Sequence, residues 1–159
     1  MEPMTKYGYD KLITELKNLK EVERPKNIIE IDTAREHGDL KENAEYHAAR
    51  ERQLFLDARI NELTQLVAEA RVIDPASLTH DKVSFGSTIK LEDLESEEQF
   101  TYTIVGATES NPEKGLISYN SPLAKQLLGK FVGDEVGVTL PKGRVDYEIL
   151  DICYKTIQF

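Results

Sequence analysis

Residues 34–46 read Ala-Arg-Glu-His-Gly-Asp-Leu-Lys-Glu-Asn-Ala-Glu-Tyr, and they decide how the first half of the chain folds. Gly38 lies between two long stretches of helical periodicity, and glycine readily adopts the left-handed backbone conformation that ends a helix. The stretch therefore predicts a turn between two antiparallel helices. Asp39 and Glu42 would then lie at the end of a hairpin, where they cannot enclose a substrate but can enter the active site of another molecule.

Apolar residues recur at helical spacing on both sides of this turn. The two series are Leu12, Leu16, Leu19, Ile28, Ile31 and Ala34, and then Leu56, Ile60, Leu63, Val67 and Ala70. Steps of three and four residues are typical of the seam between two helices. Pro25 lacks a backbone donor and predicts a bend or local break in the first helix. With Gly38 at the turn, residues whose numbers add up to about 76 should lie level across the hairpin.

The second half alternates β-type runs with turn signals. Strands are expected at 87–91, 99–105, 116–118, 135–140 and 144–149, with a further candidate at 151–154. Ser121 and Pro122 open a helix that extends to about Leu128. The sequence thus predicts an α+β protein with two domains. Residues 1–74 form an antiparallel two-helix coiled-coil hairpin, and residues 75–159 form a small antiparallel-sheet domain with one short helix.

Composition limits the function further. The 159 residues include 20 Lys and Arg against 29 Asp and Glu, which gives a net charge of -9. Strong binding to free DNA is not expected of such an acidic chain. The one cysteine, Cys153, excludes an intramolecular disulfide and a cysteine-cluster metal site. No apolar run approaches the roughly 20 residues needed to span a bilayer, and no signal peptide is evident. A cytoplasmic protein is expected.

Asp39 and Glu42 have two interpretations on spacing alone. Asp-x-x-Glu at a helix start is a capping box, in which Asp39 is the N-cap and Glu42 the third helical residue. Alternatively, both carboxylates help to hold a hard cation such as Mg²⁺, which is often bound by one or two carboxylates with water and phosphate. Two acids on an exposed tip make a weak site by themselves. They suffice only if a partner supplies the remaining ligands.

Several blocks of the sequence resemble the bacterial Gre transcript cleavage factors, and specifically the GreA type. The blocks are His37–Ala49 at the turn, Arg24-Pro25 and Asp32–Glu36 before it, and Leu116–Ala124, Leu128–Lys130 and Val132–Val136 in the second half. The resemblance covers nearly the whole chain. It implies that the second domain is FKBP-like.

The resemblance also implies a function. In this family the coiled coil enters the secondary channel of RNA polymerase while the FKBP-like domain docks outside. Asp39 and Glu42 would complete the coordination of a Mg²⁺ ion held jointly with the polymerase, which then cleaves backtracked nascent RNA near its 3′ end. The chain would activate the polymerase without being an enzyme itself. The alternatives are a channel-binding regulator that does not promote cleavage and a hairpin adaptor or chaperone unrelated to the polymerase.

Other residues acquire expected roles in the same way. Arg35, Arg50 and Arg52 occupy positions that match a basic patch contacting RNA in the family, and Tyr46 is a further candidate RNA contact. The alternative for the arginines is a solvated basic face, and the alternative for Tyr46 is packing at the end of the seam. The run Asn120-Ser121-Pro122 resembles the family's polymerase-docking loop, although Ser121 and Pro122 also suit a helix start. The factor is expected to be a monomer.

Overall fold

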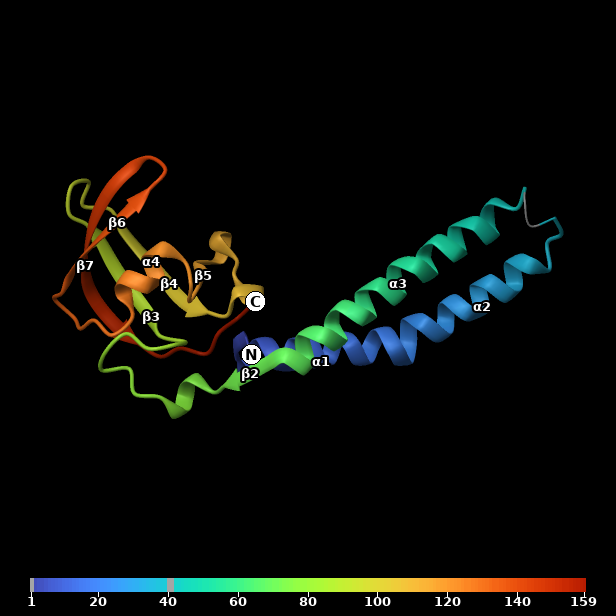
Figure 1. Cartoon of the computed structure of the whole chain (residues 1–159), viewed down its shortest axis with the longest axis horizontal. Helices are drawn as coiled ribbons and strands as arrows, with labels where there is room; N and C mark the ends of the chain where they lie inside the picture. The colour runs from blue at the N-terminus through green and yellow to red at the C-terminus, as the bar shows by residue number, and fades with distance from the viewer. Residues whose placement is uncertain (1, 40–41) are drawn as a thin grey trace. The chain divides into compact units, whose positions relative to one another are not determined.

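The computed structural model describes residues 2–39 and 42–159. The chain divides into two units, Asp10–Glu69 and a second that combines Met1–Tyr9 with Ala70–Phe159. This division differs from the boundary predicted at residue 74, because the first residues of the chain pair with the segment that follows the hairpin. Figure 1 shows the helical unit and the sheet unit, each of which is described by itself below.

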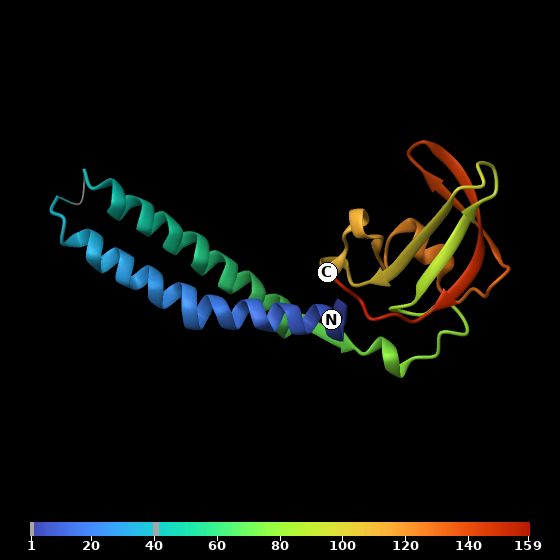
Figure 2. The ribbon, with the colours of Figure 1, turned by 180° about the vertical axis from the view of Figure 1, so that it is seen from behind.

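The helical unit is an antiparallel hairpin, and its two arms run side by side in both ribbon views (Figures 1 and 2). The first arm consists of α1 (Lys6–Asn18), a π-helical segment η1 (Leu19–Glu23) and α2 (Arg24–Arg35). The second arm is α3 (Ala44–Glu69). The predicted two-helix hairpin is therefore confirmed.

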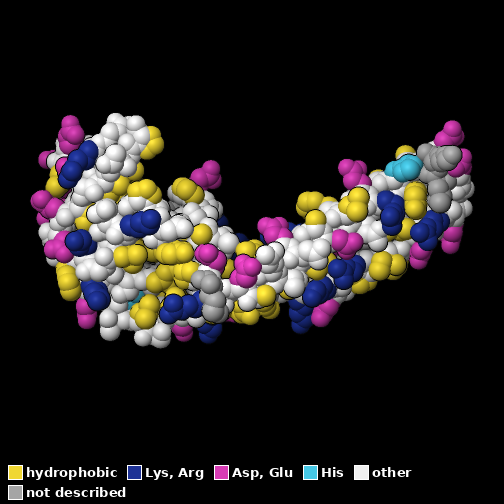
Figure 3. Space-filling model, in the orientation of Figure 1, with side chains coloured by type: hydrophobic (Ala, Val, Ile, Leu, Met, Phe, Trp, Pro, Cys, Tyr) yellow, Lys and Arg dark blue, Asp and Glu magenta, His cyan; other side chains and the backbone are white. Residues whose placement is uncertain are grey.

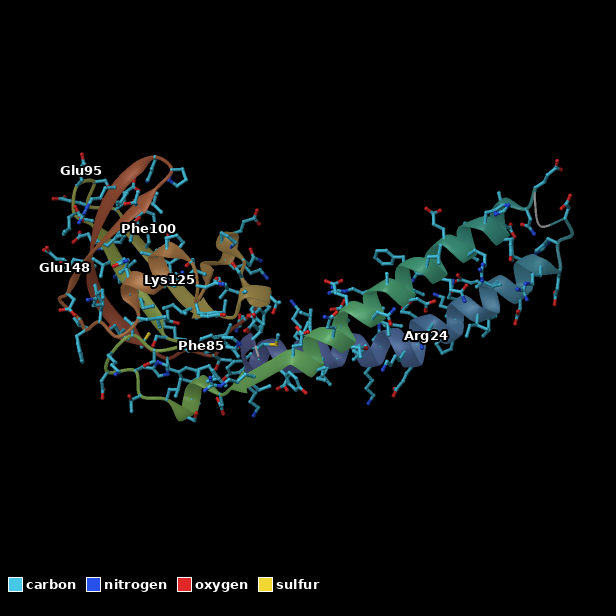
Figure 4. All side chains as sticks on the ribbon, viewed as in Figure 1. Arg24, Phe85, Glu95, Phe100, Lys125 and Glu148 are labelled. Carbon is cyan, nitrogen blue, oxygen red and sulfur yellow. The ribbon has the colours of Figure 1, made fainter. Side chains whose placement is uncertain are left out.

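Contacts across the hairpin confirm the predicted register. Asn27 bonds to Ala49, Glu23 to Arg52 and Glu15 to Arg59, so that paired residue numbers add up to between 74 and 76. The apolar part of the seam is buried at Leu19, Leu56, Ile60 and Leu63, with Leu12, Leu16 and Leu66 packed against it. Ion pairs flank this seam. In one of them, Nη2 of Arg24, which is marked in Figure 4, is 3.6 Å from Oδ1 of Asp57. Such partly exposed pairs contribute about 0–1 kcal/mol each, so the apolar contacts dominate.

One predicted seam residue is wrong: Asn27 lies in the seam, 1% exposed, while Ile28 is 48% exposed. Asn27 is four residues before Ile31 and seven before Ala34, both of which are buried, so at 3.6 residues per turn it shares their face of α2 more closely than Ile28 does. The first arm is also interrupted by the π-helical segment. The segment ends at Glu23, two residues before Pro25, whose missing backbone donor favours a disturbed hydrogen-bond pattern in the preceding turn. The predicted local break is thus a π-helical turn.

A short parallel ladder joins the two ends of the hairpin sequence. Strand β1 (Glu2–Thr5) pairs with β2 (Ala70–Ile73) from Glu2 opposite Ala70 to Thr5 opposite Ile73. Helical periodicity had placed Ala70 at the end of α3. The ladder takes precedence because β1 offers backbone partners and the β-branched Val72 and Ile73 suit a strand.

The other unit is built on a five-stranded sheet in the order β5-β4-β3-β7-β6. Its strands are β3 (Thr88–Asp93), β4 (Gln99–Val105), β5 (Leu116–Ser118), β6 (Glu135–Leu140) and β7 (Gly143–Cys153). Neighbours are antiparallel except β4 and β5, which are parallel. The predicted strands at 144–149 and 151–154 form one continuous strand, β7, because both pair with β3 on either side of a register shift between Lys90 and Leu91.

One face of this sheet carries the main core. Its buried residues are Val83, Ile89, Leu91, Ile104, Ala124, Leu127, Val136, Val138, Tyr147 and Ile149. Helix α4 (Pro122–Leu127) contributes two of them and contacts β6. Phe100, marked in Figure 4, packs its ring edge-on against Tyr147 with 6.2 Å between centroids. The α+β fold with one α-helix in the second domain is as predicted.

No helix in the described part of the chain combines the length and apolar character needed to cross a membrane.

Candidate functional site at the hairpin tip

The predicted acidic residues lie in the loop between α2 and α3. Helix α2 ends at Arg35 and α3 begins at Ala44, so Asp39 and Glu42 both precede the second helix, and both are exposed. Gly38 has a φ of +111°, the conformation that its position in the turn predicted. Figure 3 shows acidic side chains gathered at this end of the hairpin, beside a histidine and several basic side chains.

The predicted capping box is wrong. The N-cap of α3 is Asn43, whose side-chain oxygen accepts a hydrogen bond from the backbone N–H of Tyr46 at 3.1 Å. Its backbone carbonyl accepts the first helical bond, from the N–H of His47 at 3.1 Å. Asp39 is four residues before this cap, and Glu42 is not in the helix at all. Helix α2 ends at Arg35 and α3 begins only at Ala44, so the loop is longer than the predicted helix start at Asp39 allowed.

An open depression of about 420 Å³ lies at the tip, lined by His37, Asp39, Glu42, Asn43, Ala44 and Glu45. His37 Nε2 is 3.7 Å from Glu45 Oε2, a contact that crosses from the end of α2 to the first turn of α3. In the described part of the chain, no side chain has a hydrogen bond or ion pair with the Glu42 carboxylate. The tip therefore presents acidic oxygen atoms to solvent on a framework that links both helices.

The tip offers few side-chain donors to a metal ion. Among residues 2–39 and 42–159, no three His, Cys, Asp or Glu side chains converge on a position that could hold a metal. Two carboxylates leave most positions of an octahedral Mg²⁺ shell to be filled from elsewhere. Asp39 and Glu42 are thus suited to complete a cation site whose other ligands belong to a second molecule.

The candidate RNA-contacting residues fall into two groups. Arg35 and Tyr46 are together: the guanidinium carbon of Arg35 is 5.9 Å from the centre of the Tyr46 ring, in cation–π geometry. Arg50 donates to Gln53 at 2.6 Å, and Arg52 binds Glu23 of the facing arm at 2.8 Å. All three arginines are exposed and Tyr46 is half-buried. An ion pair with a partly exposed acid is what the alternative of a solvated basic face predicts for Arg52.

The candidate docking residues occupy the start of α4. The Ser121 hydroxyl accepts from the backbone N–H of Ala124 at 3.3 Å, and Pro122 is the first helical residue. Both predicted local roles are therefore confirmed. Asn120 and Pro122 are exposed, so a docking role is compatible with the helix start. Beside them, Tyr119 packs edge-on against Phe85, which is marked in Figure 4, with 6.3 Å between ring centroids.

Sequence reasoning missed two asparagines. Asn43 was hidden because the sequence offers two good capping residues, Asp39 and Asn43, and only the loop geometry selects between them. Asn27 was hidden because its amide fills a seam position that periodicity assigns to an apolar residue. Its Nδ2 donates to the Ala49 carbonyl at 3.0 Å. The run Asn43-Ala44-Glu45, a capping residue directly before good helix formers, was the signal available for Asn43.

The fold and the tip together define a class of two-domain factors in which a helical hairpin carries exposed acids and a small sheet domain accompanies it. Models of two domain families match the chain: "Transcription elongation factor, N-terminal" at residues 2–72 and "Transcription elongation factor, GreA/GreB, C-term" at residues 78–154. The chain belongs to the GreA/GreB family of transcription elongation factors, and the curated relatives below assign it to the GreA type.

These relatives are similar over almost the whole chain. The transcription elongation factor GreA of Helicobacter hepaticus is 65% identical over 99% of this chain and 97% of its own length. That of Wolinella succinogenes is 63% identical over 99% and 98%. Among solved structures, a transcription factor Gfh1 is 28% identical, covering 94% of this chain and 96% of its own with a TM-score of 0.45. A GreA/GreB factor from Nitrosomonas europaea is 21% identical, covering 97% and 100% with a TM-score of 0.44.

Proposed function

We propose that this factor inserts its hairpin into the secondary channel of RNA polymerase and stimulates the polymerase's own cleavage of backtracked nascent RNA. Membership in the GreA/GreB family supports a role in transcription elongation. One observation supports the role of the tip above all others. Because Asn43 caps α3, the exposed carboxylates of Asp39 and Glu42 are not needed to start the helix. The factor activates the polymerase and is not the catalyst.

Asp39 and Glu42 then contribute oxygen ligands to a Mg²⁺ ion whose remaining ligands come from the polymerase and the RNA. When bound, that ion promotes attack of water on the phosphodiester and stabilises negative charge on the leaving oxygen. Two carboxylates approaching an acidic active centre would be repelled without the cation, so binding of the tip and binding of the ion favour each other. This coupling explains why the acids are useful only inside the partner.

The other candidate residues have supporting roles. Arg35 and Tyr46, which lie together, contact the displaced 3′ segment of the RNA, and Arg50 and Arg52 extend the basic surface. Asn120, Ser121 and Pro122 dock on the polymerase. The factor works as a monomer in the cytoplasm and does not bind free DNA strongly, as its net charge of -9 suggests.

The test is a pair of charge-removing variants, Asp39→Asn and Glu42→Gln, in stalled polymerase complexes. Both should bind polymerase as the parent does, while the saturating rate of RNA cleavage falls roughly a hundredfold or more. Asp32→Asn is the matched control, because Asp32 is an exposed acid of α2 that does not line the depression at the tip, and this variant should cleave normally. Near-normal cleavage by both tip variants would refute the assignment of Asp39 and Glu42.

A further inference from the structure

The side chain of Asn43 connects the two helices on either side of the acidic loop. Its Nδ2 donates to the backbone carbonyl of Ala34, nine residues earlier and in the last turn of α2, at 2.5 Å. Its Oδ1 accepts from the N–H of Tyr46 in the first turn of α3 at 3.1 Å. One planar amide thus joins the end of one helix to the start of the next.

Both ends of this connection are firmly held. Ala34 is 3% exposed, and its carbonyl also accepts from the N–H of His37 at 3.1 Å. Asn43 is half-buried and directly follows Glu42. The eight residues from Arg35 to Glu42, which include both tip acids, are therefore closed into a loop by the amide. Because Glu42 is one peptide unit from the anchored residue, its direction depends on that anchor.

The residue type matters for this connection. Ser, Thr, Asp, Asn and Gly are the favoured N-caps, and any of the first four could accept from the Tyr46 N–H. Only Asn among them carries an acceptor oxygen and a separate N–H donor on the same rigid group. A carboxylate at this position would turn a second oxygen towards the Ala34 carbonyl, and a hydroxyl is too short to reach both partners. Capping alone does not require asparagine; joining the helices does.

We propose that Asn43 is a positioning residue for transcript cleavage: its amide fixes the loop so that Asp39 and Glu42 reach the same metal ion together. This inference rests on the function proposed for the two acids. Ligand placement is demanding, since an octahedral Mg²⁺ site tolerates little deviation in ligand position. The connection therefore pre-organises the tip before it enters the polymerase.

The experiment compares Asn43→Asp and Asn43→Ser with the parent. Both variants keep an oxygen that can cap α3 and both lose the donor to Ala34. The readouts are the helical circular dichroism signal, the factor concentration giving half-maximal cleavage, the saturating cleavage rate and its Mg²⁺ dependence. Asn18→Asp, at an exposed position of α1 in the same hairpin, is the matched control for the added charge.

We expect the helical signal of both Asn43 variants, and their half-maximal concentration, to stay within about twofold of the parent, while the saturating rate falls about tenfold or more. Higher Mg²⁺ should restore part of that rate, because misplaced ligands weaken ion binding, and a residue that merely stabilised the fold would not give this response. Saturating rates of both variants within about twofold of the parent would overturn the inference. So would a loss of rate matched by a loss of helical signal.

Two further variants separate this inference from the proposed function. Asp39→Asn and Glu42→Gln are assayed beside the Asn43 variants. Full cleavage by these two would defeat the proposed function of the acids. Loss of cleavage in these two, together with normal cleavage by both Asn43 variants, would defeat only the role of Asn43.

Discussion

Glu109 accepts hydrogen bonds from two groups of Thr5, a residue 104 positions earlier in the chain. Its Oε1 binds the Thr5 backbone N–H at 2.7 Å, its Oε2 binds the Thr5 hydroxyl, and Oε1 also accepts from the Gly106 N–H at 3.0 Å. Glu109 is 7% exposed and Thr5 is fully buried. Within the unit that contains the sheet, this carboxylate therefore ties the end of β1 to residues 106–109, which directly follow β4.

Burial raises the pKa of Glu109, although the three hydrogen bonds oppose the shift. Glu109 therefore holds its proton more tightly in the folded state than in the unfolded state, where the pKa of its carboxyl is near 4.5. The contribution of this group to the free energy of unfolding is then present at low pH and is lost as the pH rises through the raised folded value. Glu109→Gln should lack this pH-dependent contribution. The melting temperature of the parent should therefore fall relative to that of Glu109→Gln as the pH rises through the raised folded pKa. An increase in parent stability relative to Glu109→Gln as the pH rises above 4.5 would contradict the assignment.

Gly8 is required because of the same carboxylate. A Cβ at this position would lie 2.2 Å from Glu109 Oε2, which is far inside van der Waals contact. Gly8→Ala should lower the free energy of unfolding by about 1–3 kcal/mol. The clash disappears in a Glu109→Ala background, so Gly8→Ala should cost less there, as a double-mutant cycle by denaturant unfolding would show. Equal costs in both backgrounds would mean that Gly8 is needed for another reason.

Asn27 should stabilise the hairpin through its buried amide. Asn27→Ala removes the hydrogen bond to the Ala49 carbonyl and leaves space in the seam, which should cost about 1–3 kcal/mol. The midpoint of thermal unfolding, followed through the helical signal, measures this loss. Asn18→Ala at an exposed position of the same arm is the control and should change the midpoint little. Equal midpoints for Asn27→Ala and Asn18→Ala would show that the Asn27 amide does not stabilise the seam.

Arg52 forms an ion pair with Glu23 and is also proposed to contact RNA. The 2.8 Å contact with Glu23 is partly exposed and is expected to be worth about 0.2–1 kcal/mol. Glu23→Gln releases Arg52 and should increase crosslinking of the factor to backtracked RNA, whereas Arg52→Ala should decrease it. Crosslinking that is unchanged in both variants would leave Arg52 as a residue of the seam only.

Much of the fold could be predicted because local chemistry and tertiary structure agree. Strands β4, β5 and β6 have their predicted bounds, and Gly38 with two apolar stripes set the hairpin and its register. The misses share one cause. The β1–β2 ladder and the buried Asn27 depend on partners distant in sequence, which periodicity cannot supply.

The acidic residues of the candidate site could be predicted from the sequence, but the contacts that hold the loop around them could not. The pair Asp39 and Glu42 could be selected because carboxylates beside a helix-ending glycine are exposed in any version of the turn. Whether they cap the helix depends on how many residues the reversal uses, and two capping residues compete for that role. The contacts of Asn43 with Ala34 and Tyr46 show that Asn43, and not Asp39, caps α3.

The Mg²⁺ dependence of RNA cleavage tests the shared-metal role of Asp39 and Glu42 most directly. Stalled polymerase complexes are titrated with Mg²⁺ alone, with saturating parent factor, and with saturating Asp39→Asn or Glu42→Gln. The parent should lower the Mg²⁺ concentration for half-maximal cleavage, and each variant should return it to that of the polymerase alone while remaining bound. Identical Mg²⁺ dependence for parent and variants, with only the maximal rate changed, would show that the acids act without holding the ion.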